Sequence, residues 1–156
     1  MIDRLFAAVA LIAVPLAVSA QELTWRTDIQ PLIKEQCGGC HGATAPSYEE
    51  WNLDRKNFEA KTIGPRMDNY TDFMRHVVWP ATGSMARRLD DGKNAGGKPG
   101  NMYVFLGGDD AARAKNLATL KAWLGGDGAW NLNRWEARGS VPAITKDQLD
   151  KVKAKY

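Results

Sequence analysis

Two cysteines and a histidine lie together near the start of the chain and carry the most specific chemistry in the sequence. Cys37 and Cys40 are the only cysteines, and His41 follows them directly in the run Cys-Gly-Gly-Cys-His. On a helix, thiols at this spacing lie one turn apart, so each can add to one of the two vinyl groups along one side of a porphyrin. The imidazole of the next residue then lies beneath the ring and can bind the iron. The spacing predicts one covalently attached haem c, with His41 as the proximal ligand.

Three other kinds of site could use the same residues. A structural zinc site needs four ligands, and His76 is the only further histidine in a chain with no second cysteine pair. A thioredoxin-like redox pair calls for a βαβ setting, whereas the sequence around the motif has a helical pattern. A plain disulfide is the third alternative. The haem hypothesis is favoured because the chain starts with an export signal, and export takes a protein to the compartment where haem c is attached.

The first twenty residues have the pattern of a secretory signal peptide. Residues 5–18 are almost wholly apolar, and small residues precede a predicted cleavage after Ala20. Pro15 interrupts the apolar stretch, which is also shorter than the roughly 20 residues that a membrane-spanning helix needs. We therefore expect a cleaved signal at residues 1–20 and a mature protein in the periplasm or an equivalent compartment, without stable membrane insertion.

Length and composition narrow the remaining possibilities. The 156 residues amount to a single domain, which excludes a large multidomain enzyme. Hydrophobic residues make up 44% and charged residues 25%, as in ordinary globular proteins, so disorder and a membrane bundle are excluded as well. The net charge is +3, and the cations are scattered along the chain. This charge favours docking to an acidic protein surface over binding of nucleic acid.

The sixth coordination position of the iron is the main open choice. A thioether ligand favours ferrous iron and raises the reduction potential, a second imidazole lowers the potential, and an empty position admits small molecules. The possible ligands in the chain are Met67, Met74, Met85, Met102 and His76.

Met102 is the preferred ligand and Met85 the alternative. Met102 ends a glycine-rich loop, residues 91–100, and lies eight residues before Asp110, so the loop can cover one face of the haem before the next helix begins. Met85 precedes Asp110 by 25 residues, which also leaves enough chain. Met74 belongs to an apolar helical stripe and is expected in the core. Met67 follows the motif so closely that little chain remains to pass the haem edge.

The segment Asp28–Gly42 resembles the haem-binding N-terminal helix of the mono-haem, class I-like c-type cytochromes. Leu117, Leu120, Trp123 and Leu124 lie in a stretch, ending at Trp130, that is similar to the C-terminal helix of that family. The resemblance covers about residues 27–130 and is most specific at the haem motif. It implies two crossing helices around one haem, and a methionine ligand in a loop shortly before the C-terminal helix. The long middle of the chain and the tail after Trp130 depart from small family members.

The hydrophobic spacing predicts an all-α fold. Helices are expected from Asp28 into the cysteine motif, after a Ser47/Glu50 capping box, from Tyr70 towards Pro80, from Asp109 or Asp110 to Leu124, and after Thr145; residues 84–89 are expected to form a brief turn. We expect a small cytochrome c-like helical domain, residues 21–130, packed around the haem. Residues 131–156 form a predicted C-terminal extension with a short helix, which could pack back on the domain or hold a partner.

The haem propionates need partners that the sequence does not single out. The six tryptophans are mainly expected to supply buried area, although one or two could donate an indole N–H to a propionate. Arg66, Tyr70 and Arg75 are further possible partners.

These features predict an electron carrier that is not itself an enzyme. There is no Ser-His-Asp set and no second histidine beside the motif, so the haem would supply the redox chemistry and the protein would hold, shield and tune it. The alternative is a haem-based ligand sensor or a non-catalytic haem subunit of a larger oxidoreductase. Around the preferred ligand loop lie four cations that could guide redox partners with acidic surfaces: Arg87, Arg88, Lys93 and Lys98.

Overall fold

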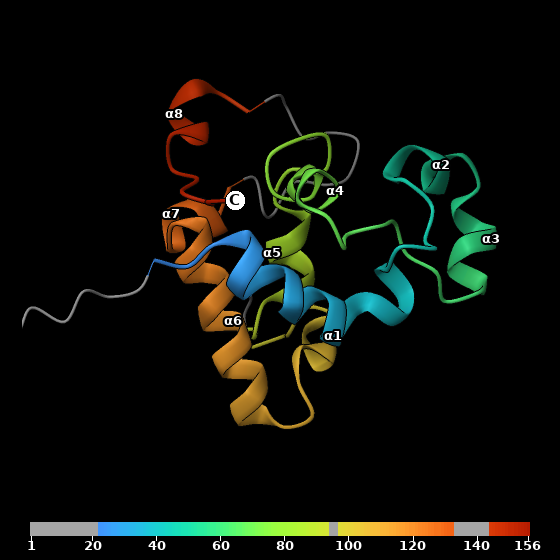
Figure 1. The fold of residues 1–156 in the computed structure, drawn as a ribbon, viewed down its shortest axis with the longest axis horizontal. Helices are drawn as coiled ribbons and strands as arrows, with labels where there is room; N and C mark the ends of the chain where they lie inside the picture. The colour runs from blue at the N-terminus through green and yellow to red at the C-terminus, as the bar shows by residue number, and fades with distance from the viewer. Residues whose placement is uncertain (1–21, 94–96, 133–143) are drawn as a thin grey trace, which may run out of the picture.

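Every regular element that the structure describes is helical, as the sequence predicts. The structure is a computed structural model that describes residues 22–93, 97–132 and 144–156 (Figure 1). The predicted signal peptide lies outside these residues. The elements are a π-helical turn η1 (Trp25–Ile29), α1 (Gln30–His41), α2 (Tyr48–Leu53), α3 (Arg55–Ala60), α4 (Tyr70–Arg75), α5 (Ser84–Leu89), a 3-10 turn η2 (Tyr103–Leu106), α6 (Asp110–Leu124), α7 (Asp127–Trp130) and α8 (Lys146–Leu149). Over the described residues, none of these helices combines the length and the apolar character that crossing a bilayer requires.

The first helical segment starts earlier than the sequence indicates. The chain turns helical at Trp25, where the Thr24 side chain accepts a hydrogen bond from the Thr27 N–H and acts as the cap. The Asp28 carboxylate accepts a bond from the Thr24 N–H at 2.8 Å, so it supports this cap from inside the turn. The prediction that the helix starts at Asp28 is therefore wrong by three residues, and Thr24, not Asp28, is the capping residue. Thr24 and Asp28 both carry side-chain oxygens that can cap a helix, and the sequence pattern alone does not show which of them does so.

The other caps follow the predicted local chemistry. Ser47 with Glu50 and Thr145 with Gln148 both form complete capping boxes, at the starts of α2 and α8. Asp109 accepts a bond from the Ala112 N–H and starts α6, which ends where Gly125 takes a positive φ of 111°. Each of these helix ends depends on residues only a few positions apart, so the sequence predicts it well.

Two helices in the middle of the chain differ in length from the prediction: the one that starts at Tyr70 is shorter, and residues 84–89 are more regular. α4 ends at Arg75, and hydrogen-bonded turns continue from there to Gly83. Residues 84–89 form a full α-helix, α5, where the sequence predicts only a brief turn. Met85, Ala86 and Leu89 are buried on its inner face, and this tertiary packing stabilises a helix that is too short to be stable alone.

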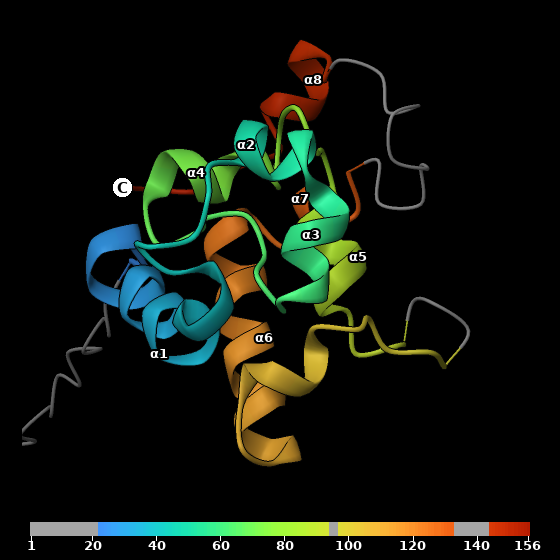
Figure 2. The same cartoon turned by 90° about the vertical axis from the view of Figure 1, so that its right-hand side faces the viewer.

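The core lies where the N-terminal helical segment meets α6. Trp25 packs against Phe73 and Trp123 with ring centroids 5.2 and 5.9 Å away. η1 contacts α6, and in Figure 1 α2 and α3 lie together on the opposite side of the view from α7; Figure 2 turns this pair towards the viewer. Four tryptophans are buried, as expected for residues that supply buried area: Trp25, Trp51, Trp123 and Trp130. Trp79 is 51% exposed, and Trp135 lies outside the described residues.

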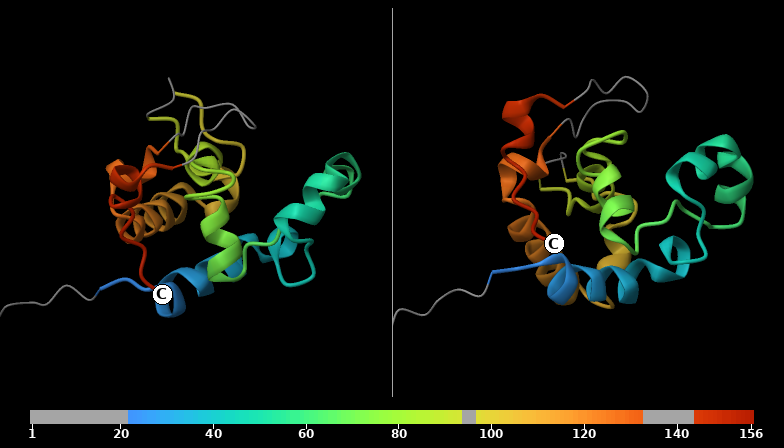
Figure 3. Two further views of the ribbon diagram at one scale, coloured as in Figure 1. Left: turned by 90° about the horizontal axis from the view of Figure 1, so that it is seen from above. Right: turned by 45° about the horizontal axis from the view of Figure 1, so that its top comes forward.

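The end of the chain packs back on this core. The Lys155 carbonyl accepts hydrogen bonds from the Trp25 backbone N–H and from the Trp123 indole N–H, both at 2.8 Å. The Lys153 N–H donates to the carbonyl of Leu124 at the end of α6. Figure 3 shows the C-terminus beside the start of η1. Because these bonds satisfy polar groups of buried aromatic residues, the last residues complete the fold of the domain.

Candidate functional site

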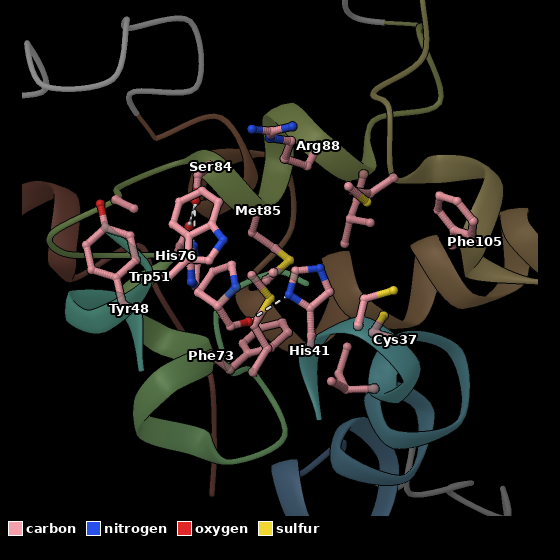
Figure 4. A pocket seen from close by; sticks show the side chains of 18 of the residues that line it. Cys37, His41, Tyr48, Trp51, Phe73, His76, Ser84, Met85, Arg88 and Phe105 are labelled. Atoms are coloured by element: carbon pink, nitrogen blue, oxygen red, sulfur yellow. Dashed lines mark hydrogen bonds between the residues drawn. The ribbon is translucent and has the colours of Figure 1, made fainter. Parts of the chain in front are cut away.

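A cavity of about 990 Å³ separates α1 from α5 and from the α2–α3 wall. Its volume lies at the upper end of the roughly 300–1,000 Å³ that ligand sites usually have, so it has room for a large flat cofactor. Cys37, Gly39, Cys40 and His41 of the cysteine motif line it, and Figure 4 shows Cys37 and His41. The structure therefore gathers the three predicted haem-attachment residues on one wall of a cavity of suitable size.

His41 is the last residue of α1, and the chain that returns from α3 fixes its ring. Its Nδ1–H donates to the Pro65 carbonyl at 2.7 Å. The Gly64 N–H binds the Cys40 carbonyl at 3.0 Å, and the Met67 N–H binds the His41 carbonyl at 2.9 Å, so the returning segment is held against the helix end. A histidine that donates from Nδ1 keeps the lone pair of Nε2 for a metal.

The protonation state of His41 suits this role. Burial lowers the pKa of His41 below its ordinary value; the bond to the Pro65 carbonyl opposes this shift and the positive charge of Arg88 adds to it. The neutral imidazole, which is the form that binds iron, is therefore favoured at neutral pH.

Both cysteines of the motif lie at the cavity. Cys37 and Cys40 are not joined by a disulfide, and Cys40 is the more exposed of the two. Burial, with a smaller contribution from Cys40, raises the pKa of Cys37 to about 11. Thiols of thioredoxin-like redox pairs instead have a lowered pKa that favours the thiolate. The environment of Cys37 thus lacks the electrostatics that lower the pKa of a redox-active thiol.

Met85 and Met102 both line the cavity, on the wall formed by α5 and η2. The Met85 side chain is only 6% exposed, and Figure 4 shows it extending from α5 towards His41. Met102 is half-buried, and its backbone N–H donates to the Arg88 carbonyl at 2.9 Å, which joins its loop to α5. The structure brings the preferred and the alternative ligand together.

The other three possible ligands are placed differently. Met67 and His76 also line the cavity, although Met67 is held close to the motif by its bond to the His41 carbonyl. His76 is buried, and its Nδ1 is hydrogen-bonded to the Ser84 hydroxyl at 3.0 Å. Met74 lies away from the cavity and packs against the hydrophobic core, as its helical stripe predicts.

Of the propionate partners suggested by the sequence, Trp51 lines the described cavity, whereas the other named residues do not. Arg66, Tyr70 and Arg75 are absent from the described cavity lining, and Arg66 is paired with Asp68 at 2.5 Å. Trp51 does line the cavity, but its indole N–H donates to the Ile63 carbonyl at 3.0 Å.

Sequence reasoning did not place Tyr48 or Arg87 at the cofactor, although both are among the polar residues that line the cavity. Burial lowers the pKa of Arg87, the neighbouring Arg88 lowers it further, and Tyr48 acts in the opposite direction, so these groups lie within electrostatic reach of one another. They come from separate short helices, and no spacing in the sequence links them. Arg87 appeared in the sequence only as part of a surface patch.

A cysteine-histidine helix end facing a cofactor-sized cavity, within an all-α fold, defines a haem-binding cytochrome of the c type. The family model described as PccH cytochrome c matches residues 24–156, and the chain belongs to this family. The solved structure of the monoheme cytochrome PccH from Geobacter sulfurreducens is similar, with 44% sequence identity and a TM-score of 0.74 over 87% of this chain and 100% of that chain. No curated protein sequence matches the chain significantly. The predicted mono-haem cytochrome family and the all-α fold are confirmed, and the chain is an electron-transfer haem protein.

Proposed function

We propose that this protein is a periplasmic one-electron carrier that holds one covalently attached haem c. Cys37 and Cys40 form the thioether links, and His41 binds the iron through Nε2. The proposal depends mainly on the position of the His41 imidazole. It lines the cavity together with the two motif cysteines, and its hydrogen bond to the Pro65 carbonyl orients it. The haem supplies the change between ferrous and ferric iron, and the chain's own residues hold it and exclude water from it.

A methionine completes the coordination of the iron in this proposal. Met102 is the proposed sixth ligand, with Met85 as the alternative, and both approach from the α5–η2 wall of the cavity. A thioether in this position favours the ferrous state and raises the potential, which suits a carrier that accepts electrons one at a time. A filled sixth position would leave no open site for a substrate, as a carrier requires.

Intact mass and the optical spectrum test the proposal directly. The full chain is expressed with a c-type maturation system, and we expect a mature mass that starts after Ala20 and includes one haem. The Cys37→Ala/Cys40→Ala double variant serves as the control and should lack the added mass. A wild-type mass without the macrocycle contradicts the proposal. A haem-containing protein whose high-spin spectrum changes with carbon monoxide supports the sensor alternative instead.

Electron transfer is expected to depend on cations beside the α5–η2 wall. Lys98 is exposed there, and the Gly100 N–H bonds the loop to the Asp90 carbonyl at the end of α5. We propose that this surface meets acidic redox partners. With an anionic reductant, the rate should fall as salt rises, by up to about tenfold from low to physiological ionic strength. Stopped-flow measurements check this dependence.

A matched pair of charge reversals separates this local effect from net charge. Lys98→Glu and Lys115→Glu change the net charge equally, but Lys115 lies on the exposed face of α6 and does not line the cavity. We expect Lys98→Glu to slow reduction by the anionic reagent more than Lys115→Glu does. Equal rates for the two variants would show that only the overall charge matters.

A further inference from the structure

The two ends of the cavity differ in chemical character. Figure 4 shows Cys37 on one side of His41, and Tyr48, Trp51, His76 and Ser84 on the other. The hydrogen bond between His76 and Ser84 and the phenol of Tyr48 make the end away from the cysteine polar. The cysteine side includes apolar residues of α1 and η2, such as Ile33 and Phe105. A ligand that fits this cavity is therefore apolar at one edge and polar at the other.

Haem has this polarity, because its two vinyl groups and its two propionates lie on opposite sides of the porphyrin. With the vinyl side linked to Cys37 and Cys40, the propionates would lie towards the other end of the cavity. A carboxylate that leaves water needs a cation or hydrogen-bond donors to replace its hydration. The polar end of the cavity must supply these groups.

We propose that Arg87 and Tyr48 form a carboxylate-binding site for the haem propionates at this end of the cavity. This inference rests on the proposed haem binding. Arg87 is half-buried on α5, and its Nη1 donates to the carbonyl of the fully buried Thr82 at 3.2 Å, which fixes the guanidinium. A planar guanidinium presents several parallel N–H donors, and this geometry matches a carboxylate better than an ammonium group does.

Tyr48 supplies the second donor from the opposite wall. It is the first residue of α2, directly after the capping residue Ser47, so the capping box sets its position. Its ring packs edge-on against His76 with the centroids 5.4 Å apart, which restricts its rotation. Arg87 and Tyr48 thus come from two helices on either side of the cavity, and the propionates would join these two walls.

The remaining cations of the cavity are placed for other contacts. Arg55 pairs with Glu59 at 2.6 Å and lies over the Trp51 ring, at the exposed edge of the α2–α3 wall. Arg88 donates to the Asn101 side chain at 3.0 Å, on the side of the cavity where Met102 lies. Glu35 on α1 adds a negative charge to the lining. Arg87 differs from these two arginines in that it is half-buried, lines the cavity and lies within electrostatic reach of Tyr48, and these features assign it to the propionates.

Arg87→Gln, compared with Lys115→Gln, tests the site. Each variant removes one positive charge, but Lys115 is exposed on α6 and does not line the cavity. The readouts are the propionate bending band in the resonance Raman spectrum and the midpoint potential from spectroelectrochemistry. We expect Arg87→Gln to shift the band and to lower the potential several times more than Lys115→Gln, because a lost cation beside the haem favours ferric iron.

Two milder variants keep the test decisive if Arg87→Gln fails to mature. Arg87→Lys keeps the positive charge but loses the planar guanidinium with its parallel N–H donors. It should therefore shift the band, with a smaller fall in potential than Arg87→Gln causes. Tyr48→Phe removes only the hydroxyl and should also shift the band. Unchanged bands in both variants, or equal shifts in Arg87→Gln and Lys115→Gln, would overturn the carboxylate site. Intact mass distinguishes failure of the carboxylate site from failure of the proposed function. A haem-loaded protein with unchanged bands contradicts the carboxylate site only.

Discussion

Gly64→Ala is expected to displace the His41 imidazole and to weaken the proximal bond to the iron. A Cβ at position 64 would lie far inside van der Waals contact of three ring atoms of His41: Cε1, Nδ1 and Nε2. The backbone cannot easily retreat, because the Gly64 N–H binds the Cys40 carbonyl and the next residue, Pro65, accepts from His41. Overpacking of this kind costs about 1–3 kcal/mol. The midpoint of thermal unfolding should therefore fall by roughly 5–10 °C.

The optical spectrum distinguishes ligand displacement from a general loss of stability. We expect the haem-loaded Gly64→Ala protein to contain a fraction of high-spin iron, because a displaced imidazole binds weakly. Gly108→Ala is the matched control, since a Cβ there meets no heavy atom within 4 Å and the residue is exposed. That control should keep the wild-type spectrum and unfolding midpoint. A wild-type spectrum and midpoint for Gly64→Ala would show that His41 does not lie against Gly64 in the haem-bound protein.

Local signals explain which parts of the fold the sequence predicts. A capping box needs a pair of residues three positions apart, and the boxes at Ser47 and Thr145 formed as expected. The haem motif is equally local, because Cys37, Cys40 and His41 lie within five consecutive residues. α5 lacks such a signal, since it depends on the core that buries Met85 and Leu89.

The groups around the motif could not be predicted in the same way. Pro65 follows His41 by 24 residues, and its carbonyl reaches the imidazole only because the chain leaves through α2 and α3 and returns to the end of α1. Arg87 and Tyr48 likewise meet the cavity from separate helices. Their positions depend on long-range packing, which hydrophobic spacing does not encode. The sequence therefore predicts the attachment residues, whereas the structure is needed to find the residues that orient and tune the cofactor.

The sequence also cannot choose between the two candidate methionines, because loop length alone allows either of them to reach the iron. The structure places both on one wall, joined by the bond from the Met102 N–H to the Arg88 carbonyl. Stability cannot separate them. Met85 is 6% exposed and packs in the core, so Met85→Ala should cost about 2–5 kcal/mol whether or not its sulfur binds iron. The readout must report on the iron–sulfur bond itself.

Met102→Ala is expected to abolish the weak band near the red end of the ferric spectrum and to lower the reduction potential, because the iron loses a thioether that favours its ferrous state. The fall should be a substantial part of the ~0.8 V range that axial ligands span. Met85→Ala should keep the band while losing stability. Met74→Ala is the control for packing alone, since Met74 contacts the core and does not line the cavity. Loss of the band in Met85→Ala alone would assign the sixth position to α5, where the buried sulfur extends towards His41, and would limit Met102 to covering the haem edge.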